Sequence, residues 1–234
     1  MRKLFLLALL LPGFLVQGQN LQMMYGFGEG NKHITTTLEM FRPDDWGNTF
    51  FFVDIEFNNG PQRHPSTAYM EIARCLRFWE APLSLHLEYN GGLLTSADGY
   101  GFPINNAWLG GVDYEWSNKN FSKILNLKLL YKNIVGINPY SFQITGVWNL
   151  NYFRDKLTLA GFADFWMEDN SFYVMGSSYI PDIYETSFIF MTEPQAWYNI
   201  NKHLALGGEV RIAHNFGTVQ GLKVSPRLGV KWSF

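Results

Sequence analysis

The sequence predicts an all-β chain that folds as a transmembrane, antiparallel, up-and-down β-barrel of about twelve strands. The first observation is residues 222–234, where even positions are apolar or proline and odd positions are polar or small. This two-residue period is that of a strand with a different environment on each face. Its thirteen residues cover the roughly 9–11 that a tilted strand needs to cross a bilayer. The second observation is that eleven other segments alternate in a similar way. The third observation is a mean hydropathy of −0.09, which is expected when a lipid-facing face and a water-facing face are averaged.

The first half of the chain contributes five predicted strands. They are residues 21–27, 33–41, 49–58, 67–78 and 83–90. The segment 83–90 is the most regular, with leucines and Tyr89 on one face and polar residues on the other. Arg74 falls among the apolar positions of 67–78, so we expect a β-bulge or a shifted register there.

The second half repeats the pattern. Its predicted strands are residues 106–116, 123–132, 140–150, 156–166, 186–198, 204–214 and 222–234. Leucines at 125, 127 and 129 alternate with Asn126 and Lys128, which we expect to face inward.

The connections between these strands alternate in length. Every second one is short and polar: residues 42–48, 77–82, 117–122, 151–156 and 199–203. The intervening ones are longer, above all 91–105 and 167–185. Short turns on one side and long loops on the other are typical of outer-membrane barrels. Large aromatic residues gather near the short turns, and we expect them to form a belt at the membrane interface: Trp46, Trp79, Trp116, Trp148, Phe153, Trp197, Tyr198, Trp232 and Phe234.

The first eighteen residues have the pattern of a secretory signal. Arg2 and Lys3 precede an apolar run, residues 4–16, and small residues follow, so we expect residues 1–18 to be a signal peptide and 19–234 the barrel. Removing Arg2 and Lys3 leaves 16 basic against 20 acidic side chains, which argues against a nucleic-acid partner. The single cysteine, Cys75, excludes a disulfide framework and a Cys-based zinc site. We expect neither a metal nor a cofactor.

The alternation also predicts which polar residues line the interior of the barrel. Those that we expect to meet a solute are Glu39, Asp54, Glu56, Tyr69, Glu71, Glu88, Asp113, Asp164, Arg211 and Arg227. Further charged residues are expected inside: Glu115, Glu193, Glu209, Arg77, Lys128, Lys223 and Lys231. Acids dominate the early strands and basic residues the late ones, and such opposed walls would orient a dipolar solute. The alternative is that these charges pair across a narrow barrel and keep it rigid.

Aromatic side chains in the lumen would stack on a base or sugar, while carboxylates would accept hydrogen bonds from hydroxyl groups. The aromatic residues expected there are Tyr25, Phe27, Tyr69, Phe162 and Trp166. An outer-membrane hydrolase would need a serine paired with a histidine. None of the five histidines suggests such a pair, so we expect the protein not to be an enzyme.

Several segments resemble a known family, the nucleoside-specific channel-forming porins of the bacterial outer membrane (Tsx-like). They are TTTLEMFRPDDWGNTFFFVDIEF at 35–57, AYMEIARCLRF at 68–78, LTLAGFADFW at 157–166, and the closing strand that ends in Phe234. The resemblance implies a monomeric twelve-stranded barrel in outer-membrane lipid, with a narrow pore for nucleosides or other small polar solutes. It also implies that the barrel assembly machinery recognises Phe234. A second hypothesis is a non-transporting surface barrel whose loops 91–105 and 167–185 bind a partner. A third is a soluble periplasmic ligand-binding barrel.

Overall fold

The computed structural model describes residues 18–28, 31–57, 64–96, 99–136, 141–172, 182–217 and 219–234. The predicted signal peptide therefore lies outside the described residues, apart from Gly18. No helix in the described part of the chain is long and apolar enough to cross a membrane.

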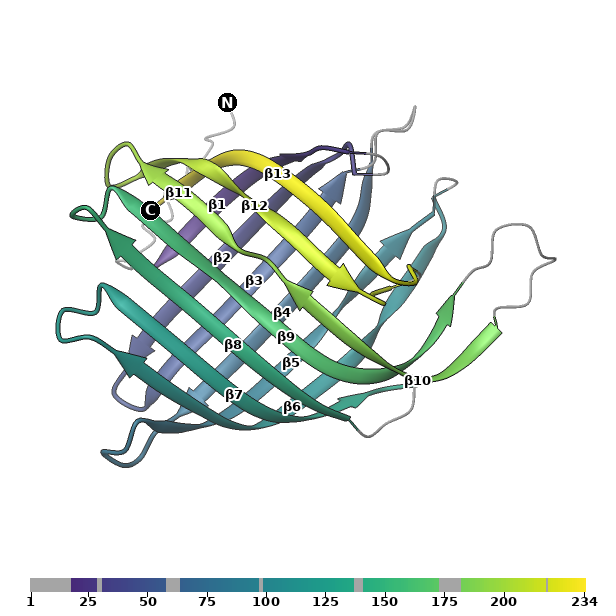
Figure 1. Cartoon of the computed structure of the whole chain (residues 1–234), viewed down its shortest axis with the longest axis horizontal. Helices are drawn as coiled ribbons and strands as arrows, with labels where there is room; N and C mark the ends of the chain where they lie inside the picture. Colours follow the sequence, from purple (N-terminus) through teal and green to yellow (C-terminus); the bar gives the residue numbers. More distant parts are fainter. Residues whose placement is uncertain are drawn as a thin grey trace, which may run out of the picture.

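The secondary structure consists of β-strands that run up and down around one barrel (Figure 1). In chain order they are β1 Gln19–Gly26, β2 Ile34–Asp44, β3 Gly47–Phe57, β4 Pro65–Leu76, β5 Leu83–Thr95, β6 Gly101–Ser117, β7 Lys123–Ile134, β8 Ser141–Tyr152, β9 Leu157–Phe172, β10 Asp182–Thr192, β11 Gln195–Asn199, β12 Leu204–His214 and β13 Leu222–Ser233.

Neighbouring strands pair antiparallel, and β1 closes the ring against β13, with Asn20 opposite Ser233 and Gly26 opposite Arg227. β10 and β11 both pair with β9 on one side and β12 on the other, so they share one position in the ring. The fold is thus a closed, twelve-stranded antiparallel barrel with one extra strand, and the predicted fold class is confirmed.

The predicted strand 186–198 is divided in two at Glu193 and Pro194. Proline has no N–H for the ladder and interrupts regular pairing. The chain still keeps contact with both neighbours, because Glu193 N–H donates to the Phe162 carbonyl (3.1 Å) and the Pro194 carbonyl accepts from Val210 N–H (3.1 Å). The interruption is therefore a local irregularity within one barrel position.

The two predicted long loops are shorter than expected. β5 continues to Thr95 and β6 begins at Gly101, so most of 91–105 is strand. Likewise β9 continues to Phe172 and β10 begins at Asp182, which leaves only 173–181, outside the described residues, of the predicted loop 167–185. The outer parts of β9 and β10 pair only with each other and project beyond the ring as a hairpin (Figure 1).

The predicted bulge at Arg74 is wrong. β3 and β4 pair in regular register from Gly47 to Glu56, with Arg74 opposite Thr49 on the outer face. The Arg74 guanidinium donates two hydrogen bonds to Asp44, at 2.5 and 2.8 Å, beside the turn between β2 and β3. An outward arginine is accommodated there because it lies at the end of the strand and carries its own counter-ion.

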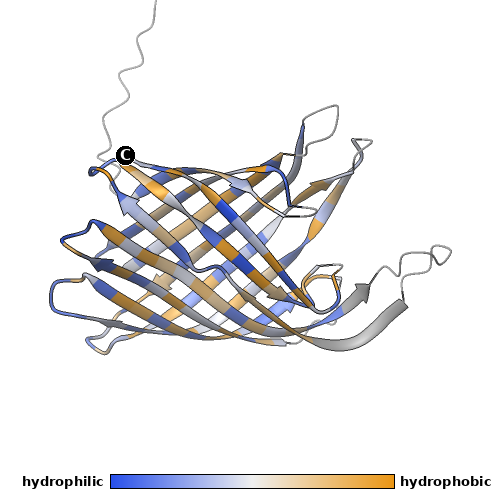
Figure 2. Ribbon diagram, turned by 45° about the horizontal axis from the view of Figure 1, so that its top comes forward, coloured by the Kyte–Doolittle hydropathy of each residue, from blue (hydrophilic) through white to orange (hydrophobic). Residues whose placement is uncertain are grey.

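Apolar and polar residues alternate along the strands (Figure 2), and the apolar ones lie on the outside. Leu85, Leu87, Leu127 and Leu129 are 44–58% exposed although they lie in the middle of strands. Such a continuous apolar exterior is unfavourable in water and fits the hydrocarbon of a bilayer.

The aromatic residues near the short turns follow the predicted pattern with one exception. Trp46, Trp79, Trp116 and Trp232 are exposed on the outside. Trp197, which we expected beside them, is only 1% exposed and lies inside the barrel. It occupies an odd position of β11, together with Gln195 and Asn199, whereas Tyr198 between them is exposed.

Candidate functional site in the barrel lumen

The interior of the barrel is filled largely by polar side chains. Those that are nearly inaccessible to solvent include Gln22, Thr35, Thr37, His86, Glu88, Asn90, Asp113, Lys132, Gln143, Thr145, Glu193, Glu209 and Arg227. Apart from Glu193, which lies between β10 and β11, they occupy strand positions, and several alternate with exposed apolar residues, as His86 does between Leu85 and Leu87. Buried charges are tolerated where they are paired, so the arrangement of these partners defines the lumen.

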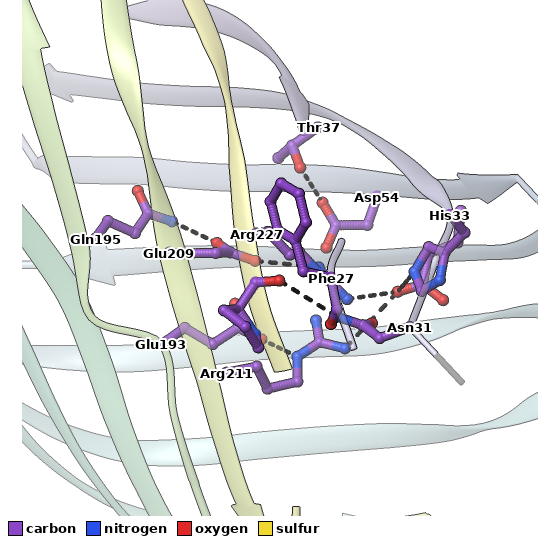
Figure 3. Close-up of polar contacts among 12 residues, drawn as sticks. Phe27, Asn31, His33, Thr37, Asp54, Glu193, Gln195, Glu209, Arg211 and Arg227 are labelled. Atoms are coloured by element: carbon purple, nitrogen blue, oxygen red, sulfur yellow. Dashed lines mark hydrogen bonds and ion pairs between the residues drawn. The ribbon is translucent and has the colours of Figure 1, made fainter. Parts of the chain in front are cut away.

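An arginine cluster, formed by Arg211, Arg227, Glu56, Glu193 and Glu209, occupies one side of the lumen (Figure 3). Arg227 donates to Glu209 at 3.0 Å and to Glu56 at 3.0 Å, and so joins β13 to β12 and to β3. Arg211 bonds to Glu193 and lies 3.7 Å from Glu56. Each arginine therefore lies between two carboxylates that come from different strands.

Further polar groups surround the arginine cluster. Gln195 donates to Glu209 at 3.1 Å, and the imidazole of His33 lies 3.6 Å from Glu56. Asp54, on the same side of the lumen (Figure 3), accepts a hydrogen bond from Thr37 at 2.5 Å. These contacts fix the rotamers of the cluster and make it a rigid part of the wall.

A second polar group lines the wall formed by β4 to β9. Tyr69 donates to Glu71 at 2.7 Å, and Thr145 donates to Asp164 at 2.5 Å. Lys132 donates to Gln143 at 2.8 Å and lies over the ring of Trp166, 4.0 Å from its centre. In the same wall, Glu88 lies 2.7 Å from His86.

The barrel has a vestibule at each end. The turn-side vestibule, about 530 Å³, is lined by residues 154–156 and 201–203 of two turns, by Glu39 and Trp197, and by Lys231. The loop-side vestibule, about 450 Å³, is lined by His33, Glu56, Arg211 and Arg227 and by residues near the β12–β13 connection, which are Phe216, Gly217, Val219 and Gly221. Both volumes are within the range of small-molecule sites.

On the part of the wall formed by β1, β13, β12 and β11, two buried side chains cover two glycines. Four residues lie in a row across four neighbouring strands. Met24 on β1 is opposite Gly229 on β13, and Gly229 is opposite Gly207 on β12. Gly207 is in turn opposite Trp197 on β11. Met24 and Trp197 belong to one apolar cluster. A Cβ at Gly229 would come within 2.6 Å of Met24 Cγ, and one at Gly207 within 2.8 Å of Trp197 Cε3. The glycines therefore make room for this Met24–Trp197 layer.

All ten of the residues predicted to meet a solute lie on the inner face, and the structure divides them into groups. Glu56, Arg211 and Arg227 meet in the arginine cluster, with Asp54 nearby. Tyr69, Glu71, Glu88 and Asp164 belong to the wall of β4 to β9, and Asp113 lies beside Cys75. Glu39 is apart from both groups, accepts from Asn20 at 2.8 Å, and lines the turn-side vestibule. Their role toward a solute stays a prediction.

Several other placements are corrected by the structure. Arg77 is exposed in the turn after β4, so it lies outside the lumen. Tyr25 and Phe27 are 43% and 42% exposed and contact each other edge to face; Tyr25 occupies an outward position of β1. The expected wall of basic charge is largely neutralised, because both lumen arginines are ion-paired. This arrangement corresponds to the alternative in which the charges pair within a narrow barrel.

Sequence reasoning missed three parts of the interior. Lys132 lies at the position after Tyr131, where the alternation already predicted an inward residue, so extending the pattern would have found it. Trp197 was assigned to the aromatic belt because it is close to a short turn. The proximity of Cys75 to His86 and Asp113 has no signal in the sequence, because the three residues lie on separate strands.

Known structures with similar folds include two porins. The NanC porin matches over 92% of this chain and 100% of its own, with a TM-score of 0.58 and 10% identity. The KdgM porin matches over 93% of this chain and 99% of its own, with a TM-score of 0.51 and 12% identity. Sequence identity this low establishes the fold alone. The fold is that of a bacterial outer-membrane β-barrel, and with the apolar exterior it places the chain in the outer membrane.

No curated protein matches the sequence. A protein-family model described as "Domain of unknown function (DUF5020)" matches residues 18–234. This match includes every strand of the barrel. The chain therefore belongs to the DUF5020 family.

Proposed function

We propose that the protein is a passive outer-membrane channel for small hydrophilic solutes. The observation that supports this most directly is on the inner face of β13. Arg227 lines the loop-side vestibule and Lys231 lines the turn-side vestibule, and Gly229 is the single inward position between them. At about 3.3 Å per residue, the four steps from Arg227 to Lys231 correspond to about 13 Å along the tilted strand. A short layer of side chains thus separates two water-accessible mouths.

The vestibules favour polar solutes. The turn-side vestibule contains Arg154, Lys156, Lys202 and Lys231 against Glu39 and Asp155, together with several asparagines. Such a lining provides donors and acceptors for hydroxyl, carbonyl and anionic groups. Nucleosides are the first solute class that we propose, because the amides and Glu39 offer partners for ribose hydroxyls. Closure of the ring by β1 and β13 within one chain also supports a monomeric channel.

Conductance of single channels in a planar bilayer tests the proposal. The full-length mature barrel is refolded in detergent, its folding is verified by the heat-dependent shift in gel mobility, and it is inserted into the bilayer in potassium chloride. We expect discrete steps of small, uniform conductance. A correctly folded and inserted barrel that gives no steps would overturn the channel proposal and favour a surface protein whose loops bind a partner.

The nucleoside hypothesis is tested in the same bilayers. Adenosine and uridine are added to one side, and free ribose serves as the control for sugar binding alone. We expect nucleosides to reduce the current reversibly, whereas ribose at equal concentration has a smaller effect. Currents that respond equally to all three compounds would exclude nucleoside selectivity and leave a general channel.

A further inference from the structure

Three potential metal ligands meet on the inner wall of the barrel. Cys75 on β4, His86 on β5 and Asp113 on β6 are all buried. The Cys75 sulfur lies 3.3 Å from His86 Nδ1 and 3.4 Å from Asp113 Oδ2. The three ligand atoms all lie within 4.8 Å of one another. They form a compact group that the proposed channel function does not explain.

Strand register brings these residues together. Cys75 is directly opposite His86, and His86 is directly opposite Gly111. Asp113 is two positions from Gly111 on the same face of β6 and therefore lies diagonally beside the imidazole. Gly111 has no side chain, so the position next to His86 is not filled by a neighbour on β6.

The two separations from the Cys75 sulfur are close to those of a tetrahedral zinc site, and the His86 and Asp113 ligand atoms lie within 4.8 Å of each other. Zinc binds sulfur at about 2.3 Å and nitrogen or oxygen at about 2.0–2.2 Å. With tetrahedral angles these bond lengths place pairs of ligand atoms about 3.4–3.6 Å apart. The two distances from the Cys75 sulfur, 3.3 and 3.4 Å, need to change by only a few tenths of an ångström.

Groups behind the three ligands orient them for a metal. His86 Nε2 lies 2.7 Å from Glu88 Oε2, so a proton on Nε2 leaves the Nδ1 lone pair directed toward Cys75. Asn126 donates to the other oxygen of Asp113 at 3.0 Å. A carboxylate behind a histidine ligand is a recurrent feature of zinc sites, because it fixes the tautomer and the ring orientation.

Charge balance is also consistent with a divalent cation. Lys128 on β7 is directly opposite Asp113. A Cys75 thiolate, Asp113 and Glu88 carry three negative charges, and Lys128 with a divalent ion carries three positive charges. A divalent ion together with Lys128 therefore balances the three anionic groups counted here, which lowers the cost of burying them.

We propose that Cys75, His86 and Asp113 form a Zn²⁺ site on the lumen wall. On binding, a zinc–sulfur bond forms, and the thiol proton of Cys75 leaves to solvent. The histidine and the carboxylate provide two further bonds, and a water molecule completes the tetrahedron. The bound ion joins β4, β5 and β6 at the inner wall.

Metal titration of the folded barrel in detergent tests this proposal. After chelator treatment and dialysis, Zn²⁺ is titrated by calorimetry, and Co²⁺ is titrated while the sulfur-to-cobalt charge-transfer absorption is recorded. Because Cys75 is the only cysteine, this absorption reports on one residue. We expect one equivalent of metal and a clear charge-transfer band. A folded barrel that lacks the band would overturn the proposal.

Variants locate the site independently. Cys75→Ser should abolish the band, and Asp113→Asn, which keeps the shape of the side chain, should weaken zinc binding at least about tenfold. Glu88→Gln changes the group behind the ligand His86. It should weaken zinc binding by about 10–100-fold, the usual cost of changing such a group. His214→Asn, at an exposed histidine outside the cluster, should bind normally. Unchanged zinc affinity in folded Cys75→Ser or folded Asp113→Asn would place the metal elsewhere and overturn the assignment.

Discussion

Arg227 connects three strands through its two ion pairs and is only 3% exposed. Its replacement leaves Glu56 and the buried Glu209 without their main counter-ion. We expect Arg227→Gln to reduce the free energy of unfolding by about 3–5 kcal/mol, the usual cost of breaking a buried ion pair, and to shift the channel toward cations. Urea titration and reversal potentials in a salt gradient measure the two effects.

Lys223 provides the matched control for that experiment. It lies on the same strand and in the same vestibule, but its side chain is exposed. Lys223→Gln removes the same charge and should change the free energy of unfolding by less than about 1 kcal/mol. Equal destabilisation by both substitutions would contradict the structural importance of the arginine cluster.

Trp197 forms most of the bulk of the Met24–Trp197 layer between the vestibules. Trp197→Ala removes the indole that covers Gly207 and should join the two vestibules, so we expect the single-channel conductance to rise severalfold. Trp232→Ala removes the same group from the outer face, where Trp232 is 46% exposed, and should leave the conductance unchanged. No difference between the two variants would mean that the constriction lies elsewhere.

Gly161 lies on β9, between β8 and the junction of β10 with β11. Because it has no side chain, the Glu193 backbone and the Trp148 side chain can both approach it closely. Its φ is +150°, and an added Cβ would lie 2.5 Å from the Glu193 carbonyl oxygen and 2.6 Å from Trp148 Cζ2. Gly161→Ala should therefore destabilise the barrel by about 1–3 kcal/mol, measured by urea titration. Gly146→Ala, on the paired strand β8 with open space around its Cα, should be tolerated.

Element positions were largely predictable, because a strand with one apolar and one polar face repeats every two residues. The ends were not. Gly91 and Gly92 suggested a loop in the sequence, whereas in the structure they lie at a bulge where β5 continues against β6. An added Cβ at Gly92 would clash with the backbone of Ala68 and Tyr69. Glycine inside a strand often marks a bulge or such a close approach, and sequence alone does not separate this case from a turn.

For the molecule as a whole, alternation predicted which residues face inward but not which of them meet. Arg227 and Glu56 are 171 residues apart and become neighbours only after the ring closes. Cys75 and Asp113 do not depend on ring closure, but their contact depends on the register of three neighbouring strands. A rule based on cysteine spacing therefore gives no signal for a group such as Cys75, His86 and Asp113, which comes from three separate strands.

The apolar exterior leads to a prediction that depends on depth in the membrane. Leu129 lies in the middle of β7 and is 53% exposed, and Leu222 lies at the end of β13 and is 68% exposed. In a bilayer, Leu129→Arg should cost about 2–4 kcal/mol and Leu222→Arg about 0–1 kcal/mol, because an arginine near the rim reaches the headgroups. Reversible unfolding from lipid vesicles measures both values. Equal costs at the two positions would contradict burial of the barrel's mid-section in lipid.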